Sequence, residues 1–175
     1  MKISHRTASI EHDIRFAVGT CSLGPLLVAQ SDKGICAILM GDDPNQLALS
    51  LQQRFPRARR ANDGALKALI AQVARFIESP ATELGGPLDM QGSGFQQRVW
   101  QALMEIPAGT TASYTDVAKR IGAPTAIRAV AQACANNKIA VAIPCHRVVR
   151  SNGSVSGYAW GVQRKLALLD LEARA

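Results

Sequence analysis

Several features are missing from this 175-residue sequence, and each absence excludes a class of protein. No apolar run approaches the ~18 residues that a membrane-spanning helix needs, so we expect no membrane partner. The first 14 residues mix charged side chains such as Lys2 and Glu11 without an apolar core, which argues against a secretory signal peptide. Hydrophobic residues make up 47% of the chain and charged residues 19%, which excludes general disorder. We therefore expect a folded, cytoplasmic protein.

The four cysteines include no C-x-x-C pair, because they stand at positions 21, 36, 134 and 145. This spacing argues against a zinc ribbon and against a redox dithiol, so we expect no metal site. A reducing compartment would also leave the thiols without structural disulfides. Each cysteine is then either a small buried hydrophobic residue or a chemically reactive group.

Acidic residues are scarce in the second half of the chain. Residues 1–92 carry 10 Lys and Arg against 9 Asp and Glu, whereas residues 93–175 carry 10 against 4. No acid stands between Asp116 and Asp170, and that interval holds Lys119, Arg120, Arg128, Lys138, Arg147, Arg150, Arg164 and Lys165. A basic face attracts polyanions, above all nucleic acid. The alternative is a solvated basic surface, and charge alone does not decide between the two.

The first part of the chain, residues 1–92, has the pattern of a small sheet with helices. Short apolar runs at 14–18, 26–29 and 35–39 are separated by turn residues, which predicts an antiparallel sheet. Asp43 with Pro44, and later Asp63, are typical helix starts. The glycine-rich and proline-rich stretch 83–93 is typical of a connection between two domains.

The second part, residues 93–175, has the pattern of a helical domain. Ser93 and Ser113 suit N-caps, and the last helix is expected from about residue 160. Short helices over 114–121 and 125–135 are joined by a Gly-Ala-Pro turn and form a candidate helix-turn-helix. The fold class is therefore α/β (α+β), with an N-terminal domain over 1–92 and a C-terminal domain over 93–175.

The second helix of the candidate helix-turn-helix carries few groups that could read bases. Arg128 and Gln132 are its long polar side chains, and alanines such as Ala129 surround them. Specific reading of bases relies on several bidentate Arg, Asn or Gln contacts, so this helix favours a sequence-tolerant DNA binder.

Cys145 is the candidate nucleophile, because it follows a proline and precedes His146 and Arg147. The thiolate is the reactive form of cysteine, and neighbouring cations lower its pKa, so we expect an ionised sulfur here. Adjacent side chains of an extended strand point to opposite faces. His146 could therefore serve as the base for Cys145 only across a turn or through a water. From this spacing alone, a buried unreactive cysteine stays the alternative.

The motif Ile143-Pro144-Cys145-His146-Arg147-Val148-Val149 resembles the active-site signature of the O6-alkylguanine-DNA alkyltransferases. The similarity extends over nearly the whole chain and includes segments 94–100, 113–114, 127–130, 136–137 and 156–161. Residues 34–43 are similar to the methyltransferase domain of the bacterial Ada type. The resemblance implies a ribonuclease H-like N-terminal domain and a C-terminal domain with a winged helix or helix-turn-helix.

The resemblance implies a single-turnover cysteine methyltransferase that works without a cofactor. Cys145 would take the alkyl group irreversibly from O6-alkylguanine in double-stranded DNA, with O4-methylthymine as a second substrate. His146 would take the thiol proton through a water, and Glu172 would orient His146. The alternative for Glu172 is a place on a solvated helix face. A monomer in the bacterial cytoplasm is expected.

Because O6 lies inside the stacked duplex, the resemblance also implies that the nucleotide is flipped out of the helix. Arg128 would fill the vacated space, and Tyr114 would promote rotation and donate to N3 of the leaving guanine. The remaining DNA contacts are expected from Ser113, Ala129 and Gln132. The substrate pocket is expected to involve Asn137, Val148, Tyr158, Ala159 and Trp160.

Two other functions remain open on the sequence. The first is a non-catalytic binder of alkyl lesions, against which Cys145 argues, because alkyltransferase-like lesion binders lack the cysteine. The second is a helix-turn-helix regulator, against which the signature around Cys145 argues. Trp160 stands where some members carry a small residue, so we expect bulky O6-benzyl adducts to react worse than methyl adducts.

Overall fold

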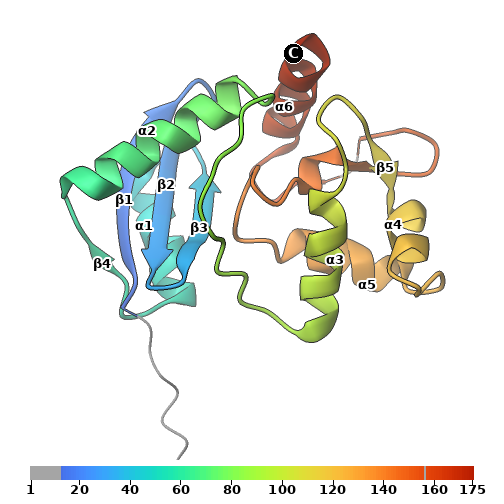
Figure 1. Ribbon diagram of the computed structural model, residues 1–175, viewed down its shortest axis with the longest axis horizontal. Coiled ribbons are helices and arrows are strands. Elements are labelled where there is room, and N and C mark those ends of the chain that lie inside the picture. Colours follow the sequence, from blue (N-terminus) through green and yellow to red (C-terminus); the bar gives the residue numbers. More distant parts are fainter. Residues whose placement is uncertain (1–12, 156) are drawn as a thin grey trace, which may run out of the picture.

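The computed structural model describes residues 13–155 and 157–175, and it places a sheet with two helices beside a mainly helical part (Figure 1). Residues 1–12 and Ser156, which belongs to the motif at 156–161, lie outside the described residues. Among the described residues, no helix has both the length and the apolar character to cross a membrane.

The sheet of the N-terminal part has four strands in the order β3-β2-β1-β4. The strands are β1 (Arg15–Cys21), β2 (Gly24–Ser31), β3 (Gly34–Met40) and β4 (Arg59–Arg60). The first three pair antiparallel, as expected, but β4 pairs parallel to β1. The Arg59 N–H donates to the Ile14 carbonyl at 2.9 Å, so Arg59 and Arg60 form a short edge strand with exposed side chains.

Helices α1 (Pro44–Arg54) and α2 (Gly64–Glu78) lie on opposite faces of this sheet (Figure 1). Each begins where an aspartate was expected to cap it, because Asp43 accepts from the Asn45 N–H and Asp63 from the Leu66 N–H. Since both faces are covered, β3 is buried along its whole length.

The free edge of β3 is covered by the segment that leads to Cys145. Ile38 donates its N–H to the Lys138 carbonyl and accepts from the Ala140 N–H, both at 2.9 Å. In the connecting stretch, Ile35 donates its N–H to the Pro87 carbonyl and accepts from the Asp89 N–H. The N-terminal sheet thereby fixes the backbone that enters the candidate active site.

The C-terminal part contains short helices around a two-stranded parallel ladder. Its elements are α3 (Gly94–Met104), β5 (Ala112–Ser113), α4 (Tyr114–Arg120), α5 (Ile127–Ala135), the 3₁₀ turn η1 (Cys145–Arg147), β6 (Val148–Val149) and α6 (Val162–Arg174). Ser93 and Ser113 each form a capping box, with Gln96 and Asp116 respectively.

Two helix starts differ from the sequence expectation. Helix α5 begins at Ile127 rather than at residue 125, because residues 123–126 form a turn in which the Ala126 N–H donates to the Ala123 carbonyl. Helix α6 begins at Val162 rather than near Trp160, because Gly161 adopts φ +98°. That left-handed conformation suits glycine and interrupts the helix on its N-terminal side.

Candidate active site

Cys145 lies in a tight turn and not in an extended strand. The Arg147 N–H donates to the Pro144 carbonyl at 3.0 Å, and the Val148 N–H donates to the Cys145 carbonyl. Shortly before the turn, Val141 adopts φ +67°, a conformation that is costly for a β-branched residue and that is concentrated at functional sites. The turn therefore supplies the departure from strand geometry that Cys145 and His146 require.

Asn137 forms hydrogen bonds with the backbone that leads into this turn and with the sulfur of Cys145. Its side chain is fully buried, and its Nδ2 donates to the Ile143 carbonyl at 2.9 Å and to Cys145 Sγ at 3.3 Å. Its Oδ1 accepts from the Ile139 N–H. One amide thus links both ends of the loop and donates to the candidate nucleophile.

Glu172 is buried beneath the turn and joins His146 to Arg147. Glu172 Oε1 lies 2.7 Å from His146 Nε2, and Arg147 donates from Nε and Nη2 to the same carboxylate. Arg147 Nη1 also donates to the Ile106 carbonyl. Glu172 is only 4% exposed, so the alternative of a solvated helix face does not hold.

Lys165 is a residue of this site that the sequence interpretation missed. Its side chain is 1% exposed, and Nζ donates to the Val148 carbonyl at 2.7 Å. Lys165, Leu168 and Glu172 are the buried residues of α6, at helical spacing. That spacing was the available signal for Lys165, although for Glu172 the sequence also left a solvated helix face as the alternative.

The pKa shifts of Cys145 and His146 indicate a protonated thiol next to a neutral imidazole. Burial raises the pKa of Cys145 to about 11, although the Asn137 hydrogen bond and the charge of Lys165 act in the opposite direction. The thiolate expected from nearby cations is therefore not the resting form. Burial likewise lowers the pKa of His146, more than the carboxylate of Glu172 raises it, so the imidazole is neutral at pH 7.

Glu172 is ionised in the same cluster. Burial raises the pKa of Glu172, but the hydrogen bonds and charges of His146 and Arg147 outweigh it and hold that pKa at about 2. An ionised carboxylate only accepts hydrogen bonds, so His146 Nε2 carries the proton in this pair. His146 Nδ1 is then an acceptor, and it is buried without a hydrogen-bond partner among the described residues.

A pocket of about 550 Å³ opens beside Cys145, between α5 and the segment that follows β6. This volume lies in the range of small-molecule sites. The described lining residues are Tyr114, Ile127, Arg128, Ala131, Cys134, Ala135, Cys145, Arg150, Gly157, Tyr158 and Ala159. Cys134 was not singled out from the sequence; burial raises its pKa to about 12, so it lines the pocket as a neutral thiol.

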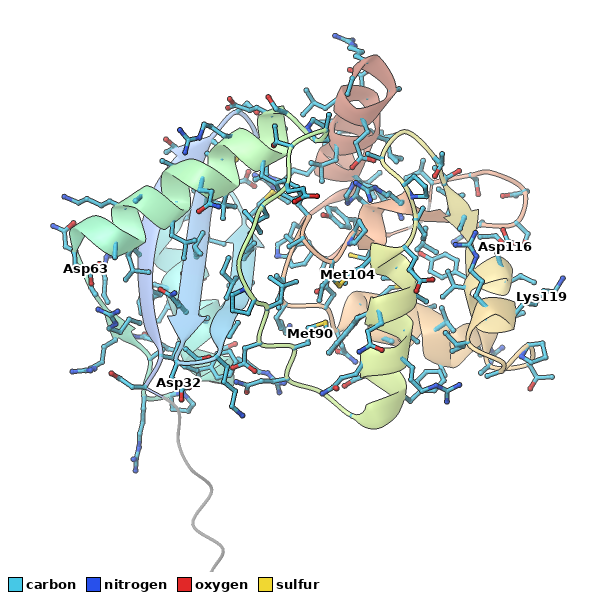
Figure 2. All side chains as sticks on the ribbon, in the orientation of Figure 1. Asp32, Asp63, Met90, Met104, Asp116 and Lys119 are labelled. Atoms are coloured by element: carbon cyan, nitrogen blue, oxygen red, sulfur yellow. The ribbon has the colours of Figure 1, made fainter. Side chains whose placement is uncertain are left out.

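The expected DNA-contact residues lie at the start of α4 and on α5. Figure 2 shows Asp116 and Lys119 on the outer side of α4. Arg128, Ala129 and Gln132 are exposed on α5. The structure thus brings Tyr114 and Arg128 to the pocket, whereas the other three are not among its lining residues.

Ser113 is occupied in the structure by a local role. Its hydroxyl accepts from the Asp116 N–H at 3.0 Å as the N-cap of α4. A contact from this residue to DNA would therefore have to share the hydroxyl with the cap or use the backbone.

Of the five expected pocket residues, Tyr158 and Ala159 line the pocket and three lie elsewhere. Asn137 is beneath the turn, and Val148 is fully buried with its carbonyl bonded to Lys165. Trp160 lines a second pocket of about 220 Å³, which it shares with α1 and β3. Its ring meets the ring of Tyr158 edge-on, with centroids 5.2 Å apart.

The basic face is smaller than the sequence indicates. Arg147 and Lys165 are buried and bound to Glu172 and to the Val148 carbonyl, and the partly buried Arg164 is bound to Asp42 at the surface. The exposed members of the set are Lys119, Arg120, Arg128, Lys138 and Arg150. Within residues 13–155 and 157–175, no group of three or more His, Cys, Asp and Glu side chains is placed to hold a metal ion.

Comparison with known proteins identifies the family to which this site belongs. Two family models match: the ribonuclease-like domain of 6-O-methylguanine DNA methyltransferase over residues 14–90, and its DNA binding domain over residues 94–174. The bifunctional transcriptional activator/DNA repair enzyme Ada of Escherichia coli is 52% identical over 161 residues, which are 91% of this chain and 46% of that protein. The chain therefore spans about half the length of the Ada proteins that it matches.

Shorter relatives are covered more completely. The methylated-DNA–protein-cysteine methyltransferase of Mycobacterium tuberculosis is 47% identical over 125 residues, which are 70% of this chain and 76% of that protein. The crystal structure of Mycobacterium tuberculosis OGT in complex with DNA superposes with a TM-score of 0.77 at 35% identity, covering 91% of this chain and 93% of that chain. The protein described here belongs to the 6-O-methylguanine DNA methyltransferase family.

Proposed function

We propose that this protein repairs DNA by taking the alkyl group of O6-alkylguanine onto Cys145 in one irreversible turnover. The observation that carries the proposal is a buried thiol at a pocket, next in sequence to a neutral histidine that is held by an ionised glutamate. The names of the methyltransferase relatives and the DNA-bound OGT structure support the same reaction and substrate class.

The first step is removal of the thiol proton. His146 Nδ1 is the free acceptor of the imidazole, and we infer that a water carries the proton of Cys145 Sγ to it. The resulting imidazolium is stabilised by Glu172 at 2.7 Å. Lys165 lowers the pKa of Cys145 by its charge, so it stabilises the thiolate that forms. The pair of new charges is therefore balanced within the cluster.

The second step is displacement at the alkyl carbon. The bond from Cys145 Sγ to that carbon forms while the bond from the carbon to O6 breaks, and the electron pair of the broken bond goes to the guanine. Tyr114, which lines the pocket, donates a hydrogen bond or proton toward N3 of the leaving base. A thioether remains on the protein and no cofactor takes part.

Access to O6 requires that the nucleotide leaves the stack. Arg128 is exposed at the first turn of α5 and borders the pocket, which supports a role in filling the space that the nucleotide vacates. Ala129 beside it allows close approach of the helix to the minor groove, and Gln132 and Ser113 extend the contact. Lys119, Arg120 and Arg150 supply phosphate contacts.

The pocket residues divide into those that touch the base and those that hold the loop. Tyr158 and Ala159 would contact the flipped guanine, together with backbone groups at Cys145. The Val148 carbonyl already accepts from Lys165, so it would contact the base only by accepting a second hydrogen bond. Asn137 would hold the loop, and Trp160 would limit the size of the alkyl group from behind Tyr158. O4-methylthymine fits the same reaction as a second substrate.

The proposal includes the organisation of the chain. Residues 1–92 and 93–175 would act as two domains, the second with the chemistry and the first as support for its loop. We infer that the protein works as a monomer in the cytoplasm.

Mixing the protein with a duplex oligonucleotide that contains O6-methylguanine tests this function. Peptide mass spectrometry should find one added methyl group on Cys145, and Cys145→Ala should bind the duplex without accepting methyl. Cys21→Ala, which removes a thiol of β1 that is not among the lining residues of the pocket, is the matched control and should transfer normally. Binding without transfer by the unaltered protein would favour a lesion binder, and methyl on another residue would move the nucleophile.

A further inference from the structure

Arg164 joins three separate parts of the chain through one guanidinium. Nε donates to the Leu23 carbonyl at 3.1 Å, Nη1 to the Trp160 carbonyl at 3.0 Å and Nη2 to Asp42 Oδ1 at 2.6 Å. Leu23 lies in the turn between β1 and β2, and Asp42 follows β3. The guanidinium carries its donors on three nitrogens in one plane, so it can reach three acceptors that lie in different directions. A lysine has all its donors on one nitrogen and cannot span the same acceptors.

The burial of this contact shows that it is more than a surface ion pair. The Arg164 side chain is 16% exposed, whereas that of Asp42 is 95% exposed. An ion pair with so exposed a carboxylate contributes little, so the two bonds to backbone carbonyls dominate. Gly24 allows the close approach, because a Cβ at that position would lie 3.4 Å from Arg164 Nη2 and 3.2 Å from the Gly41 carbonyl oxygen.

The bond to the Trp160 carbonyl acts on the wall of the catalytic pocket. Ala159 lines both the Cys145 pocket and the second pocket, while Tyr158 lines only the first and Trp160 only the second. Residues 158–160 are therefore the wall between the two pockets. The edge-on contact of the Tyr158 and Trp160 rings makes this wall one packed unit.

We propose that Arg164 is a positioning residue that fastens the wall 158–160 to the N-terminal sheet and thereby keeps the catalytic pocket closed toward the second pocket. This proposal rests on the proposed function and deepens it. With the wall held in place, the pocket accepts small alkyl groups well and bulky groups poorly. Without Arg164, the wall can shift into the 220 Å³ space behind it, where α1 and β3 leave room.

Transfer measurements with two alkyl groups test the effect on the pocket. We expect Arg164→Ala to slow transfer from O6-methylguanine while it slows transfer from free O6-benzylguanine less or speeds it. The ratio of the two rate constants should change about tenfold, which corresponds to ~1.4 kcal/mol of differential stabilisation. Equal slowing with both substrates would overturn the proposal, because general destabilisation affects both reactions alike.

Hydrogen exchange measured by mass spectrometry tests the fastening without any reaction. In Arg164→Ala, the amides of residues 158–163 and of the β1–β2 turn should exchange faster than in the unaltered protein, while those of α2 should not change. Unchanged exchange at 158–163 would overturn the proposal. If the exchange increases but the unaltered protein transfers no alkyl group, the fastening stands and the proposed function fails.

Three further variants separate the carbonyl bonds from the charge. Asp42→Asn removes only the exposed ion pair, so it should keep the methyl-to-benzyl ratio close to that of the unaltered protein. Arg164→Lys keeps the charge and should fold even if the alanine variant does not, yet it should still alter the ratio. Arg59→Ala breaks the exposed pair with Asp13 and is the matched control. If Arg164→Lys keeps the methyl-to-benzyl ratio of the unaltered protein, a positive charge at this position is sufficient, and the proposed role of the guanidinium hydrogen bonds is wrong.

Discussion

Replacing Glu172 with glutamine would leave a buried cation without its counterion. The carboxylate accepts from Arg147 through two nitrogens and from His146, and the side chains of all three residues are at most 9% exposed. Glutamine keeps the size and one acceptor oxygen but removes the negative charge. Breaking a buried ion pair on one side costs roughly 3–5 kcal/mol, because the remaining charge is uncompensated. This loss is a large part of the ~5–15 kcal/mol that stabilises a domain.

The same helix offers a control for this prediction. Asp170 pairs with Arg174 at 2.8 Å, but the two side chains are 57% and 76% exposed, so Asp170→Asn should cost at most about 1 kcal/mol. Thermal denaturation monitored by circular dichroism measures the melting temperature of both variants. For a chain of this size, roughly 2–4 °C is lost per kcal/mol, so Glu172→Gln should melt about 6–20 °C lower.

The reasoning fails if the two variants are equally stable. That result would mean that the Arg147 guanidinium is satisfied without Glu172, by the Ile106 carbonyl or by water. Transfer should be measured well below the melting temperature of the variant. It should be slower there, because His146 loses the charge that fixes its tautomer and stabilises its imidazolium.

Three other outcomes follow from the site. Arg128→Ala should slow repair of duplex DNA more than reaction with free O6-alkylguanine, and equal slowing would contradict its place in the vacated stack. The rate of transfer should stay constant from pH 8 to 6.5 and fall at lower pH, because the pKa of His146 lies below its usual 6.5 and the neutral imidazole is the base. A rate that falls about tenfold per pH unit between pH 9 and 7 would show that hydroxide removes the thiol proton instead. DNA affinity should decrease with salt at a log–log slope of about −3, at roughly −0.9 for each of the proposed phosphate contacts Lys119, Arg120 and Arg150. A slope near −7 would mean that all eight basic residues of the interval reach phosphate.

Acid should also destabilise the protein. Both Glu172, with a pKa of about 2, and His146, with a lowered pKa, bind fewer protons when folded than when unfolded. Stability therefore rises with pH wherever the unfolded chain is the more protonated state. The loss should begin as the pH falls through the usual His range and continue as it approaches 2. A urea midpoint that is constant from pH 7 to 4 would contradict these assignments.

Local chemistry explains why much of the fold could be predicted. Asp43, Asp63, Ser93 and Ser113 each cap the helix that the sequence assigned to them, because a cap depends on residues within one turn. The three antiparallel strands follow from apolar runs between turns. The parallel pairing of β4 could not be predicted in this way, because it depends on a partner about 44 positions away.

The site was only partly accessible to the same reasoning. A run of basic residues without acids predicts a basic face, yet Arg147 is neutralised by Glu172, which stands 25 positions later. Lys165 is buried by the packing of α6, and its helical spacing to Leu168 and Glu172 was a weak signal beside the charge of the side chain. Whether a charge is on the surface or inside is decided by tertiary partners, so composition overestimated the exposed positive charge. The motif around Cys145 was informative because its neighbours in sequence are also its neighbours in space.

The same buried charges explain why a protonated thiol can still be a competent nucleophile. A pKa of about 11 means that the thiolate is rare at neutral pH, so in the proposed reaction transfer of the proton to His146 would be coupled to attack. That transfer creates a negative sulfur and a positive imidazole, and Lys165 and Glu172 are already in place to stabilise them without rearrangement. After alkylation, the thioether carries no proton and accepts only weakly, so the bond from Asn137 Nδ2 loses most of its strength. In the proposed reaction the alkylated sulfur cannot ionise again, so the cluster would not support a second transfer.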